Sequence, residues 1–342
     1  MTSYDRIIRY AWRAYDHSRY IETIEDISAR VSTNSVFRLT MGDGNTLIAK
    51  VTVFGSFSGF VEDHLIINVL ANNLPVRYGG FLSRALMRGN SIFFHRYIDD
   101  DTDCFVVFYR SINISDRPPA RFSAEQVRTL GREMAAFHSD CTLVHHTLPE
   151  SDRNMTTDLK KLLRVLPEQF SPAEQKIIEA QCHSFLENTF RINDLGFRKI
   201  PVFVDWNIGN FSMGADGSLI SRWDYDWFRM STRMSDFYFL SRVVSDVGDR
   251  DEFTYEVDRM TEPRFLEFLK AYHEVFPLTR PEVLFLKEAY RFFLLNYVLR
   301  LGQYFFRSHI ARQLRDDVLS VHLPTLDDRF DPRALADALE LK

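Results

Sequence analysis

Acid and amide side chains interrupt a strand-like stretch in the second half of the chain. In "VDWNIGNFSM", residues 204–213, Asp205 and Asn210 stand among residues that otherwise suit a β-strand. A second acid, Asp224, follows another short strand-like run. The turn sequence "GADG" at 214–217 predicts a hairpin, which would bring Asp205, Asn210 and Asp224 to the same edge.

These side chains suit phosphoryl transfer. Carboxylate and amide oxygens are hard ligands, and Mg²⁺ favours carboxylates together with the phosphates of a substrate. One acid, Asp205, could orient a hydroxyl group, while Asn210 and Asp224 hold the metal ion on a nucleotide. The alternative is that all three residues are ordinary turn or cap residues of a β-hairpin.

The segment 202–240 resembles the active-site region of the aminoglycoside phosphotransferase and choline kinase family, whose motif is H-G-D-x-x-x-x-N followed by I-D-W or I-D-F. The resemblance implies a catalytic role for Asp205, metal binding by Asn210 and Asp224, and a structural role for a third acid, Asp236. The chain departs from the motif at Phe203, where the family usually has a histidine that braces the loop.

The first part of the chain carries matching features. Lys50 ends a strand-like run and resembles the family lysine that pairs the α- and β-phosphates. Glu62, with Asp63 as its near competitor, resembles the ion-pair partner of that lysine. Two further segments complete the implied nucleotide site: the covering loop "VSTNSVFR" at 31–38 with Ser32 and Asn34, and the hinge "YRSI" at 109–112 with Arg110 and Ile112.

Three residues beside the metal-site acids are candidates for contact with the acceptor molecule. Asp226, Trp206 and Trp227 would face the mouth of the cleft, and aromatic faces attract cations. His138, by contrast, lies on an apolar helix face and is expected to be a hydrogen-bonded core residue.

The elements that must position these residues fall into a sheet-rich part and a helical part. Apolar spacing predicts helices over 3–16 and 61–71, and strands over 35–41, 46–54, 91–98 and 104–112. Ser123 with Gln126 forms a capping-box pattern that opens a helix to about residue 138. Further helices are expected over 157–165, 172–190, 263–275, 281–305 and 306–317, with a β-like insert at 201–224.

The expected architecture is an α+β, bilobal, protein-kinase-like fold. Residues 1–112 would form a small, mostly antiparallel-sheet N-lobe that binds the nucleotide. Residues 113–342 would form a larger helical C-lobe with the catalytic and metal-binding hairpins and the acceptor pocket.

Composition narrows the class of protein. The 342 residues include 42 basic and 47 acidic side chains, a net charge of −5, which argues against a general nucleic-acid binder. The N-terminus has no signal-peptide pattern, and no apolar run is long enough to span a bilayer. The three cysteines are scattered, as is typical of a reducing cytoplasm.

The sequence therefore predicts a cytoplasmic, ATP- and Mg²⁺-dependent phosphotransferase that acts on a hydroxyl group of a small metabolite or antibiotic-like acceptor. No nucleic acid or membrane partner is expected, and the oligomeric state is left open. Two alternatives stay open as well. One is a degenerate kinase-like protein that binds nucleotide without turnover. The other is a kinase-fold transferase that acts on protein or transfers a nucleotide instead of a phosphoryl group.

Overall fold

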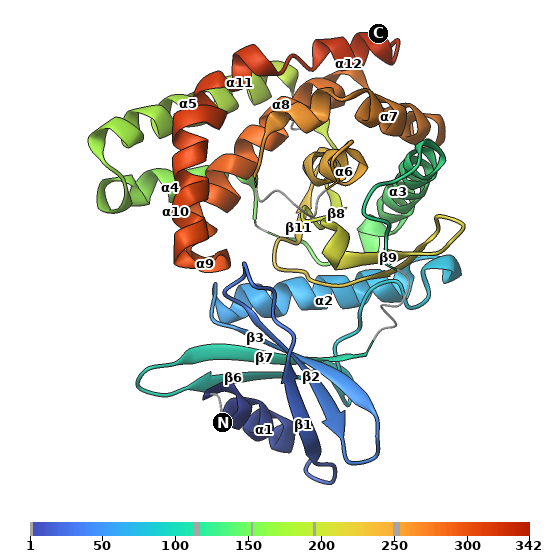
Figure 1. Ribbon diagram of the computed structural model, residues 1–342, viewed down its shortest axis with the longest axis vertical. Coiled ribbons are helices and arrows are strands. Elements are labelled where there is room, and N and C mark those ends of the chain that lie inside the picture. Colours follow the sequence, from blue (N-terminus) through green and yellow to red (C-terminus); the bar gives the residue numbers. More distant parts are fainter. Residues whose placement is uncertain (1–2, 112–116, 152, 194–195, 249–253) are drawn as a thin grey trace.

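The fold is described from a computed structural model in which two lobes stack one above the other (Figure 1). The structure describes residues 3–111, 117–151, 153–193, 196–248 and 254–342. The N-lobe comprises the elements from α1 to β7, and the C-lobe comprises those from α3 onward.

The N-lobe is built on one five-stranded sheet in the order β1-β2-β3-β7-β6, and every neighbouring pair is antiparallel. Residues 42–45 form the hairpin turn between β2 and β3, at the position between the strands predicted over 35–41 and 46–54. The strands and short β-segments of this lobe are β1 (Ile21–Asp26), β2 (Ser35–Met41), β3 (Thr46–Thr52), β4 (Met87–Arg88), β5 (Ser91–Ile92), β6 (Phe94–Ile98) and β7 (Asp103–Arg110).

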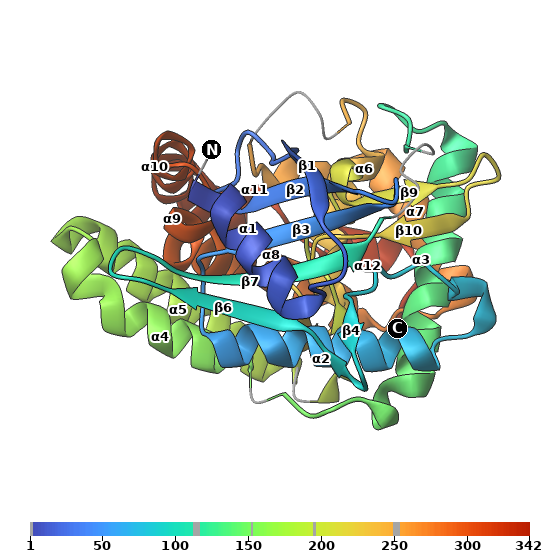
Figure 2. The same cartoon turned by 90° about the horizontal axis from the view of Figure 1, so that it is seen from below.

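Two helices cover the two faces of this sheet. Helix α1 (Ser3–Tyr15) buries Ile8 and Trp12 against strand residues such as Leu39, on the face turned away from the C-lobe (Figures 1 and 2). Helix α2 (Phe57–Asn73) lies between the sheet and the C-lobe (Figure 1). Because side chains alternate along β3, Ala49 faces α1 whereas Lys50 faces the interlobe side.

The C-lobe is mostly helical and holds the larger hydrophobic core. The capping box predicted at Ser123 and Gln126 is present and opens α3. The main helices are α3 (Ala124–Val144), α4 (Met155–Gln169), α5 (Pro172–Ile192), α6 (Phe237–Val244), α7 (Pro263–Val275), α8 (Arg280–Phe293), α9 (Gly302–Phe305), α10 (Ser308–Asp317), α11 (Leu323–Arg329) and α12 (Arg333–Ala338).

The single helix predicted over 281–305 is interrupted. α8 passes at Leu294–Arg300 into a π-helical segment, and α9 begins at Gly302. Within the π-helical segment all side chains except Arg300 are buried, and Arg300 bonds the side chain of Asn296. π-Helical turns are frequent at functional sites, so this segment is a place to look for a ligand-binding surface.

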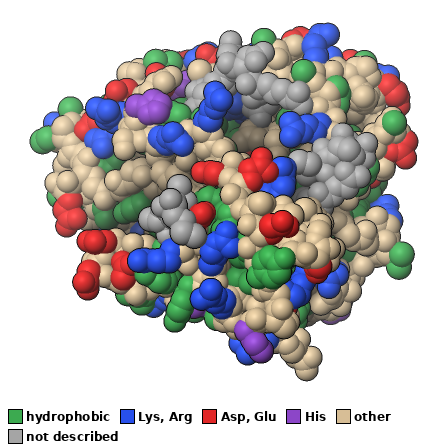
Figure 3. Space-filling view, turned by 60° about the horizontal axis from the view of Figure 1, so that its bottom comes forward, with side chains coloured by type: hydrophobic (Ala, Val, Ile, Leu, Met, Phe, Trp, Pro, Cys, Tyr) green, Lys and Arg blue, Asp and Glu red, His purple; other side chains and the backbone are tan. Residues whose placement is uncertain are grey.

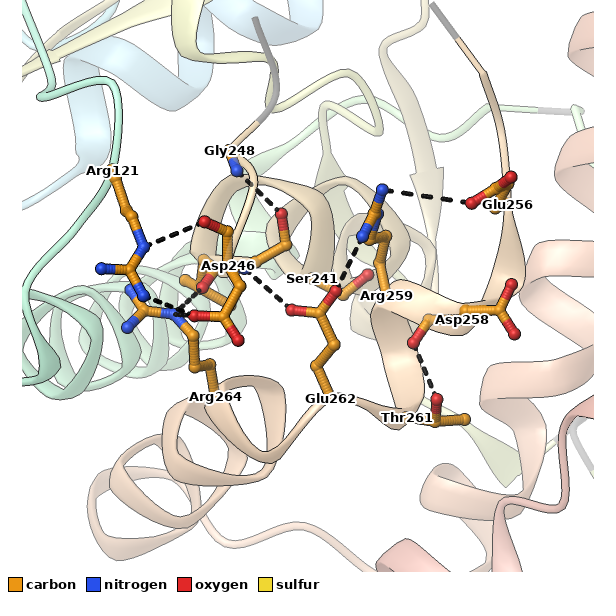
Figure 4. Close-up of polar contacts among 12 residues, drawn as sticks. Arg121, Ser241, Asp246, Gly248, Glu256, Asp258, Arg259, Thr261, Glu262 and Arg264 are labelled. Atoms are coloured by element: carbon orange, nitrogen blue, oxygen red, sulfur yellow. Dashed lines mark hydrogen bonds and ion pairs between the residues drawn. The ribbon is translucent and has the colours of Figure 1, made fainter. Parts of the chain in front are cut away.

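A polar network fastens the segment that enters the C-lobe (Figure 4). Arg121 donates to the carbonyl and the carboxylate of Asp246, at 2.9 and 2.6 Å. Arg264, on α7, lies 3.7 Å from the same carboxylate. Nearby, Glu262 accepts from Arg259 at 3.0 Å and from the Asp246 backbone at 2.9 Å. The start of α3 is thereby tied to the end of α6 and the start of α7.

A backbone clasp joins the lobes on the other side of the molecule. It consists of residues 31–34, in the connection between β1 and β2, and residues 304–307, which span the end of α9 and the two residues after it. The Thr33 N–H donates to the Phe305 carbonyl, and the Arg307 N–H donates to the Val31 carbonyl, both at 3.0 Å. Ser32 and Phe306 form an isolated β-bridge between these two bonds.

The surface carries both signs of charge. Figure 3 shows acidic and basic side chains interspersed over one face and around a hollow near its centre. Among the described residues, no helix is both long enough and apolar enough to cross a membrane.

Candidate active site

Two short antiparallel β-pairs position the acids predicted from the sequence. β8 (Ile200–Val202) pairs with β11 (Arg229–Ser231), and β9 (Phe211–Met213) pairs with β10 (Leu219–Arg222). Asp205 follows β8, Asn210 immediately precedes β9, and Asp224 and Asp226 lie between β10 and β11. The Trp223 N–H donates to the Asn210 carbonyl at 3.0 Å, which fixes the end of the predicted hairpin.

A buried arginine, Arg222, holds the backbone segments of this site together, and the sequence analysis did not predict this role. Arg222 has no exposed surface, and its guanidinium donates to the carbonyls of Asp205 at 2.8 Å, Asn210 at 2.9 Å and Trp223. Its carbon Cζ lies 5.1 Å from the ring centroids of both Phe203 and Trp206. One desolvated cation, held by carbonyls and ring faces, therefore fixes the backbone on both sides of the site.

Phe203, the position at which the sequence departs from the resembled motif, is fully buried in this arrangement. Its ring packs against Phe137, Trp206 and Phe228 at centroid distances between 5.4 and 6.1 Å. The loop that begins at Asp205 is thus supported from below by an aromatic cluster and by Arg222.

Two backbone positions in the site have left-handed dihedral angles. Val204 has φ = 61° and Asp224 has φ = 66°. For a β-branched residue such as Val204 this conformation is rare and costs roughly 1–3 kcal/mol. Asp236 supports it, because one carboxylate oxygen accepts the N–H groups of Phe203 at 3.0 Å and Val204 at 2.6 Å.

The other carboxylate oxygen of Asp236 accepts a hydrogen bond from Nε2 of His138 at 3.0 Å. Nδ1 of His138 shares a hydrogen bond of 2.8 Å with the Tyr272 hydroxyl group. His138 and Asp236 have no exposed surface. These contacts match the structural role expected for Asp236 and confirm that His138 is a hydrogen-bonded core residue.

The Lys50 side chain extends from strand β3 to two acids of the C-lobe. Its ammonium lies 3.0 Å from Asp224 Oδ1 and 2.6 Å from Asp226 Oδ1. The Asn34 amide donates to Asp226 Oδ2 at 2.6 Å. Burial tends to lower the pKa of Lys50, but the two carboxylates outweigh it and raise the pKa above its usual value. A permanently charged ammonium therefore stands between two carboxylates.

The two acids respond differently to that arrangement. Burial tends to raise the pKa of Asp224, but the Lys50 ammonium prevails and lowers it to about 2. For Asp226, burial and the neighbouring Asp224 charge prevail over Lys50 and raise the pKa to about 6. Two carboxylates that share one ammonium cannot both be fully stabilised, and Asp224 holds the negative charge.

The prediction that Glu62 forms an ion pair with Lys50 is wrong. In the described chain the ammonium contacts the two C-lobe acids instead. Helical spacing explains this, because Phe60, His64 and Ile67 form the inward face of α2, and residue 62 lies about 200° around the helix from residue 60. Its near competitor, Asp63, forms an ion pair with Arg153.

His64, rather than Glu62, is the buried polar side chain on the inward face of α2. Its Nδ1 lies 2.8 Å from the Phe60 carbonyl, which can only accept, so this nitrogen carries the proton. Nε2 then accepts from the Tyr109 hydroxyl group at 2.5 Å. Burial lowers the pKa of His64 to about 4, and the nearby charge of Lys50 acts in the same direction.

The other residues predicted to hold the nucleotide lie in two places. Ser32 and Asn34 belong to the clasp, and the Asn34 amide donates to Asp226. The three acids Asp205, Asp224 and Asp226 are called the acid cluster below. Arg110 ends β7 at the expected hinge, but its backbone N–H already donates to the Arg84 carbonyl at 3.1 Å. That N–H is therefore engaged within the protein. Ile112 lies outside the described residues.

The two tryptophans are not at an open cleft mouth, which corrects that expectation. Trp206 has no exposed surface and packs against Phe137, Phe203 and Phe211. Trp227 is only 6% exposed and packs closely against Tyr297, at 5.0 Å between centroids, although it borders a cavity. Large rings near a site are favoured as core residues because their burial removes so much apolar surface from water.

The donor set fits a metal ion that is held jointly with phosphates. The Asn210 amide nitrogen donates to the Asp205 carbonyl at 3.3 Å, which leaves its oxygen for a ligand. The Asp224 side chain is 39% exposed, and Lys50 contacts only its Oδ1. Within the described residues, no group of three or more His, Cys, Asp or Glu residues could hold a metal alone. Two protein oxygens plus phosphate oxygens are the usual set for Mg²⁺.

A cavity of about 610 Å³ adjoins the acid cluster. Its walls come from the β3–α2 connection, helix α4, the π-helical segment and α9, and Asp226 and Trp227 lie on its wall. The volume suits a small organic molecule. The cavity thus places a candidate acceptor site beside the residue that contacts both Lys50 and Asn34.

Comparison with known proteins identifies the fold. No protein-family model and no curated protein sequence matches this chain. Among solved structures, amicoumacin kinase hAmiN in complex with AMP-PNP, Ca²⁺ and Ami is 15% identical, with 92% of each chain covered and a TM-score of 0.62. The microcompartment-associated aminopropanol kinase is 13% identical, with 98% of each chain covered and a TM-score of 0.63. The chain has the kinase-like fold of these proteins.

An aminoglycoside phosphotransferase has the same fold. APH(2'')-Ib in its ADP-bound form is 13% identical, with 94% of this chain and 99% of that chain covered and a TM-score of 0.55. The bilobal fold predicted from the sequence is therefore confirmed over nearly the whole chain. At these identities the likeness establishes the fold, and the chemistry has to be argued from the residues of the site.

Proposed function

We propose that the protein is a phosphotransferase that moves the γ-phosphoryl group of Mg·ATP to a hydroxyl group of a small molecule. The observation that carries the proposal is the contact between Lys50 of the sheet and Asp224 of the C-lobe at 3.0 Å. This contact joins the two halves of a phosphate- and metal-binding site across the interlobe cleft. Neighbours of the same fold are kinases and phosphotransferases, and some of them were determined with AMP-PNP or ADP.

In this proposal each described side chain has a defined task. Lys50 neutralises the phosphates, and it exchanges its contacts with Asp224 and Asp226 for contacts with phosphate oxygens. Asn210 and Asp224 hold Mg²⁺, which supplies positive charge on the phosphates when it is bound. Asp205 orients the acceptor hydroxyl group and takes up its proton as the bond to phosphorus forms.

Positioning comes from the surrounding residues. Arg222 and Asp236 fix the backbone on either side of Asp205, so its carboxylate is held in place before an acceptor arrives. Such preorganisation supplies much of the rate enhancement in phosphoryl transfer, since the protein forms no covalent intermediate.

One observation favours a second candidate, a kinase-like protein with little turnover. The Lys50 ammonium forms ion pairs with Asp224 and Asp226, and Glu62 does not contact this ammonium. A lysine held in this way binds phosphates only after the acids release it. Nucleotide binding without transfer would then be the result.

The test is a transfer assay with labelled ATP. The protein is incubated with Mg²⁺, a metabolite extract and ATP that carries the label in either the α- or the γ-position, and products are identified by mass spectrometry. The proposal predicts a new phosphorylated small molecule that carries the γ-label. Label from the α-position would indicate nucleotidyl transfer, label on protein would indicate a protein acceptor, and tight ATP binding without any product would support the second candidate.

A further inference from the structure

The wall of the 610 Å³ cavity carries an uneven set of charges. Asp158, on α4, is buried, and its carboxylate faces three cations. Arg229 and Arg300 each lie 3.2 Å from one of its oxygens, and Lys161 lies at 3.6 Å. All four side chains border the cavity. This group, Asp158 with Arg229, Arg300 and Lys161, is called the cation cluster below.

The excess is local to this end of the cavity, because the other charged groups of the wall form their ion pairs elsewhere. Asp226 shares the Lys50 ammonium with Asp224, which leaves one negative charge at the opposite end. Asp63 is paired with Arg153 on the side of the cavity formed by α2. Within the cation cluster one carboxylate is therefore shared by three cations, so two positive charges are not balanced by a carboxylate of the cluster.

Desolvation makes this excess costly. The Arg229 side chain is 4% exposed and that of Arg300 is 17% exposed, so water screens them poorly. Nε of Arg229 is buried and has no hydrogen-bond partner among the residues that the structure describes. Burial lowers the pKa of Arg300, and the neighbouring Arg229 charge adds to that effect. An anionic ligand would accept a hydrogen bond from this buried donor and would balance the surplus positive charge beside it.

We infer that the acceptor of the proposed reaction carries an anionic group, a carboxylate or a phosphate, that binds at the cation cluster while its hydroxyl group faces the acid cluster. The inference rests on the proposed function for the identity of the cavity as the acceptor site. Trp227 and Tyr297 supply an aromatic wall for the carbon skeleton between the two ends. An ammonium-bearing acceptor would meet repulsion at the cation cluster.

The experiment compares three six-carbon polyols that differ only at one end: gluconate, glucitol and glucamine. Binding to the full-length protein is measured by titration calorimetry without nucleotide, so its outcome does not depend on phosphoryl transfer. We expect gluconate to bind at least about tenfold more tightly than glucitol, and glucamine to bind most weakly. Equal affinities, tighter binding of glucamine, or no detectable binding of gluconate would overturn the inference.

Variants locate the binding to the cavity. Arg300→Gln should weaken gluconate binding by about tenfold and leave glucitol binding unchanged. Lys161→Gln, whose side chain is 49% exposed, should act in the same direction and preserve the fold if loss of Arg300 disturbs it. Arg164→Gln, an exposed position on the same helix, is the matched control and should leave both affinities unchanged.

Equal losses in Lys161→Gln and Arg164→Gln would show general electrostatic attraction and would contradict a built site. The labelled-ATP assay separates the two proposals. Phosphorylation of glucitol as fast as gluconate would support the phosphotransferase and overturn the anionic acceptor. Selective gluconate binding without any phosphoryl transfer would support the anionic ligand and would contradict the phosphotransferase.

Discussion

Asp205 is the residue on which the proposed chemistry depends most directly. Asp205→Asn keeps the shape and one acceptor oxygen, but it removes the charge and the ability to take up a proton. We expect kcat to fall by about 10²–10⁴-fold while the affinity for Mg·ATP stays close to that of the parent. Single-turnover phosphoryl transfer and an ATP titration, on parent and variant, measure the two quantities.

Asp216→Asn is the matched control for that variant. Asp216 lies in the exposed turn between β9 and β10, where Oδ1 accepts from the Ser218 backbone at 3.0 Å and from its hydroxyl group at 2.7 Å. Its loss should leave kcat unchanged. An undiminished transfer rate in Asp205→Asn would contradict the role of this acid.

Asp224 and Asp226 both contact Lys50, but the Asp224 side chain is 39% exposed and that of Asp226 is 19% exposed. Asp224 also follows Trp223, whose N–H donates to the Asn210 carbonyl. We expect Asp224→Asn to shift the Mg²⁺ concentration for half-maximal activity upward and to lower kcat more than Asp226→Asn does. In Asp226→Asn the Mg²⁺ midpoint should stay at the parental value. Initial rates over a Mg²⁺ titration test this. A larger effect of Asp226→Asn than of Asp224→Asn would show that Asp226, and not Asp224, is the metal ligand.

At the residue scale, the polar positions with strict spacing could be predicted from sequence, and the packing around them could not. Asp205, Asn210 and Asp224 stand out because polar residues interrupt apolar strands. The pairing of Glu62 with Lys50 was predicted wrongly because apolar periodicity fixes the inward face of α2 only to within one or two residues. Which side of the helix meets the sheet is decided by tertiary packing. Arg222 resembles any strand arginine until its burial is known.

Among the helices, α3 and α7 approach each other closely. A Cβ added at Gly131 of α3 would lie 2.6 Å from the Phe268 carbonyl oxygen and 3.1 Å from the Ala271 Cβ on α7. Because backbone cannot give way as a flexible side chain can, Gly131→Ala should lower the free energy of unfolding by about 1–3 kcal/mol. Urea denaturation of parent and variant measures this difference.

Gly59→Ala in α2 is the matched comparison. There the nearest atom to an added Cβ is the Ser56 hydroxyl oxygen at 3.1 Å, which belongs to a side chain. Helix propensity favours Ala over Gly by about 1 kcal/mol, so this variant should be at least as stable as the parent. A stability loss of the same size in both variants would show that the α3–α7 contact is not the cause.

At the element scale, the longer helices and the hairpin at 214–217 followed from periodicity, caps and turn residues, whereas the short helices α6, α11 and α12 did not, and neither did β1 and the π-helical segment. β1 has a short charged sequence, "IETIED", with a register shift in its pairing to β2, and edge strands of this kind carry little apolar alternation. The π-helical segment at Leu294–Arg300 has the same apolar character as the helix before it, so only the backbone reveals the change.

For the whole molecule, the buried His64 links stability to pH. Its pKa is lowered from 6.5 to about 4, so between these pH values the unfolded chain binds more protons than the folded one. The stabilisation is complete above pH 6.5 and is lost as the pH falls towards 4, by about 3 kcal/mol. His64→Gln removes this titration but can still bond the Phe60 carbonyl and the Tyr109 hydroxyl group.

The measurement is the free energy of unfolding of the parent and His64→Gln at pH 4.5 and pH 7. The parent should lose more stability on acidification than the variant does. His309→Gln, at an exposed position of α10, should behave like the parent. Parallel pH profiles for the parent and His64→Gln would show that the histidine is already charged in the folded protein.

The clasp between residues 31–34 and 304–307 has a kinetic consequence. It holds the loop predicted to cover the nucleotide against the C-lobe, while Asn34 bonds Asp226 at 2.6 Å. A nucleotide that enters or leaves beneath this loop has to wait until several hydrogen bonds open together. We therefore expect exchange to be gated by the protein, with an association rate constant below the diffusion limit and a long residence time for the spent nucleotide.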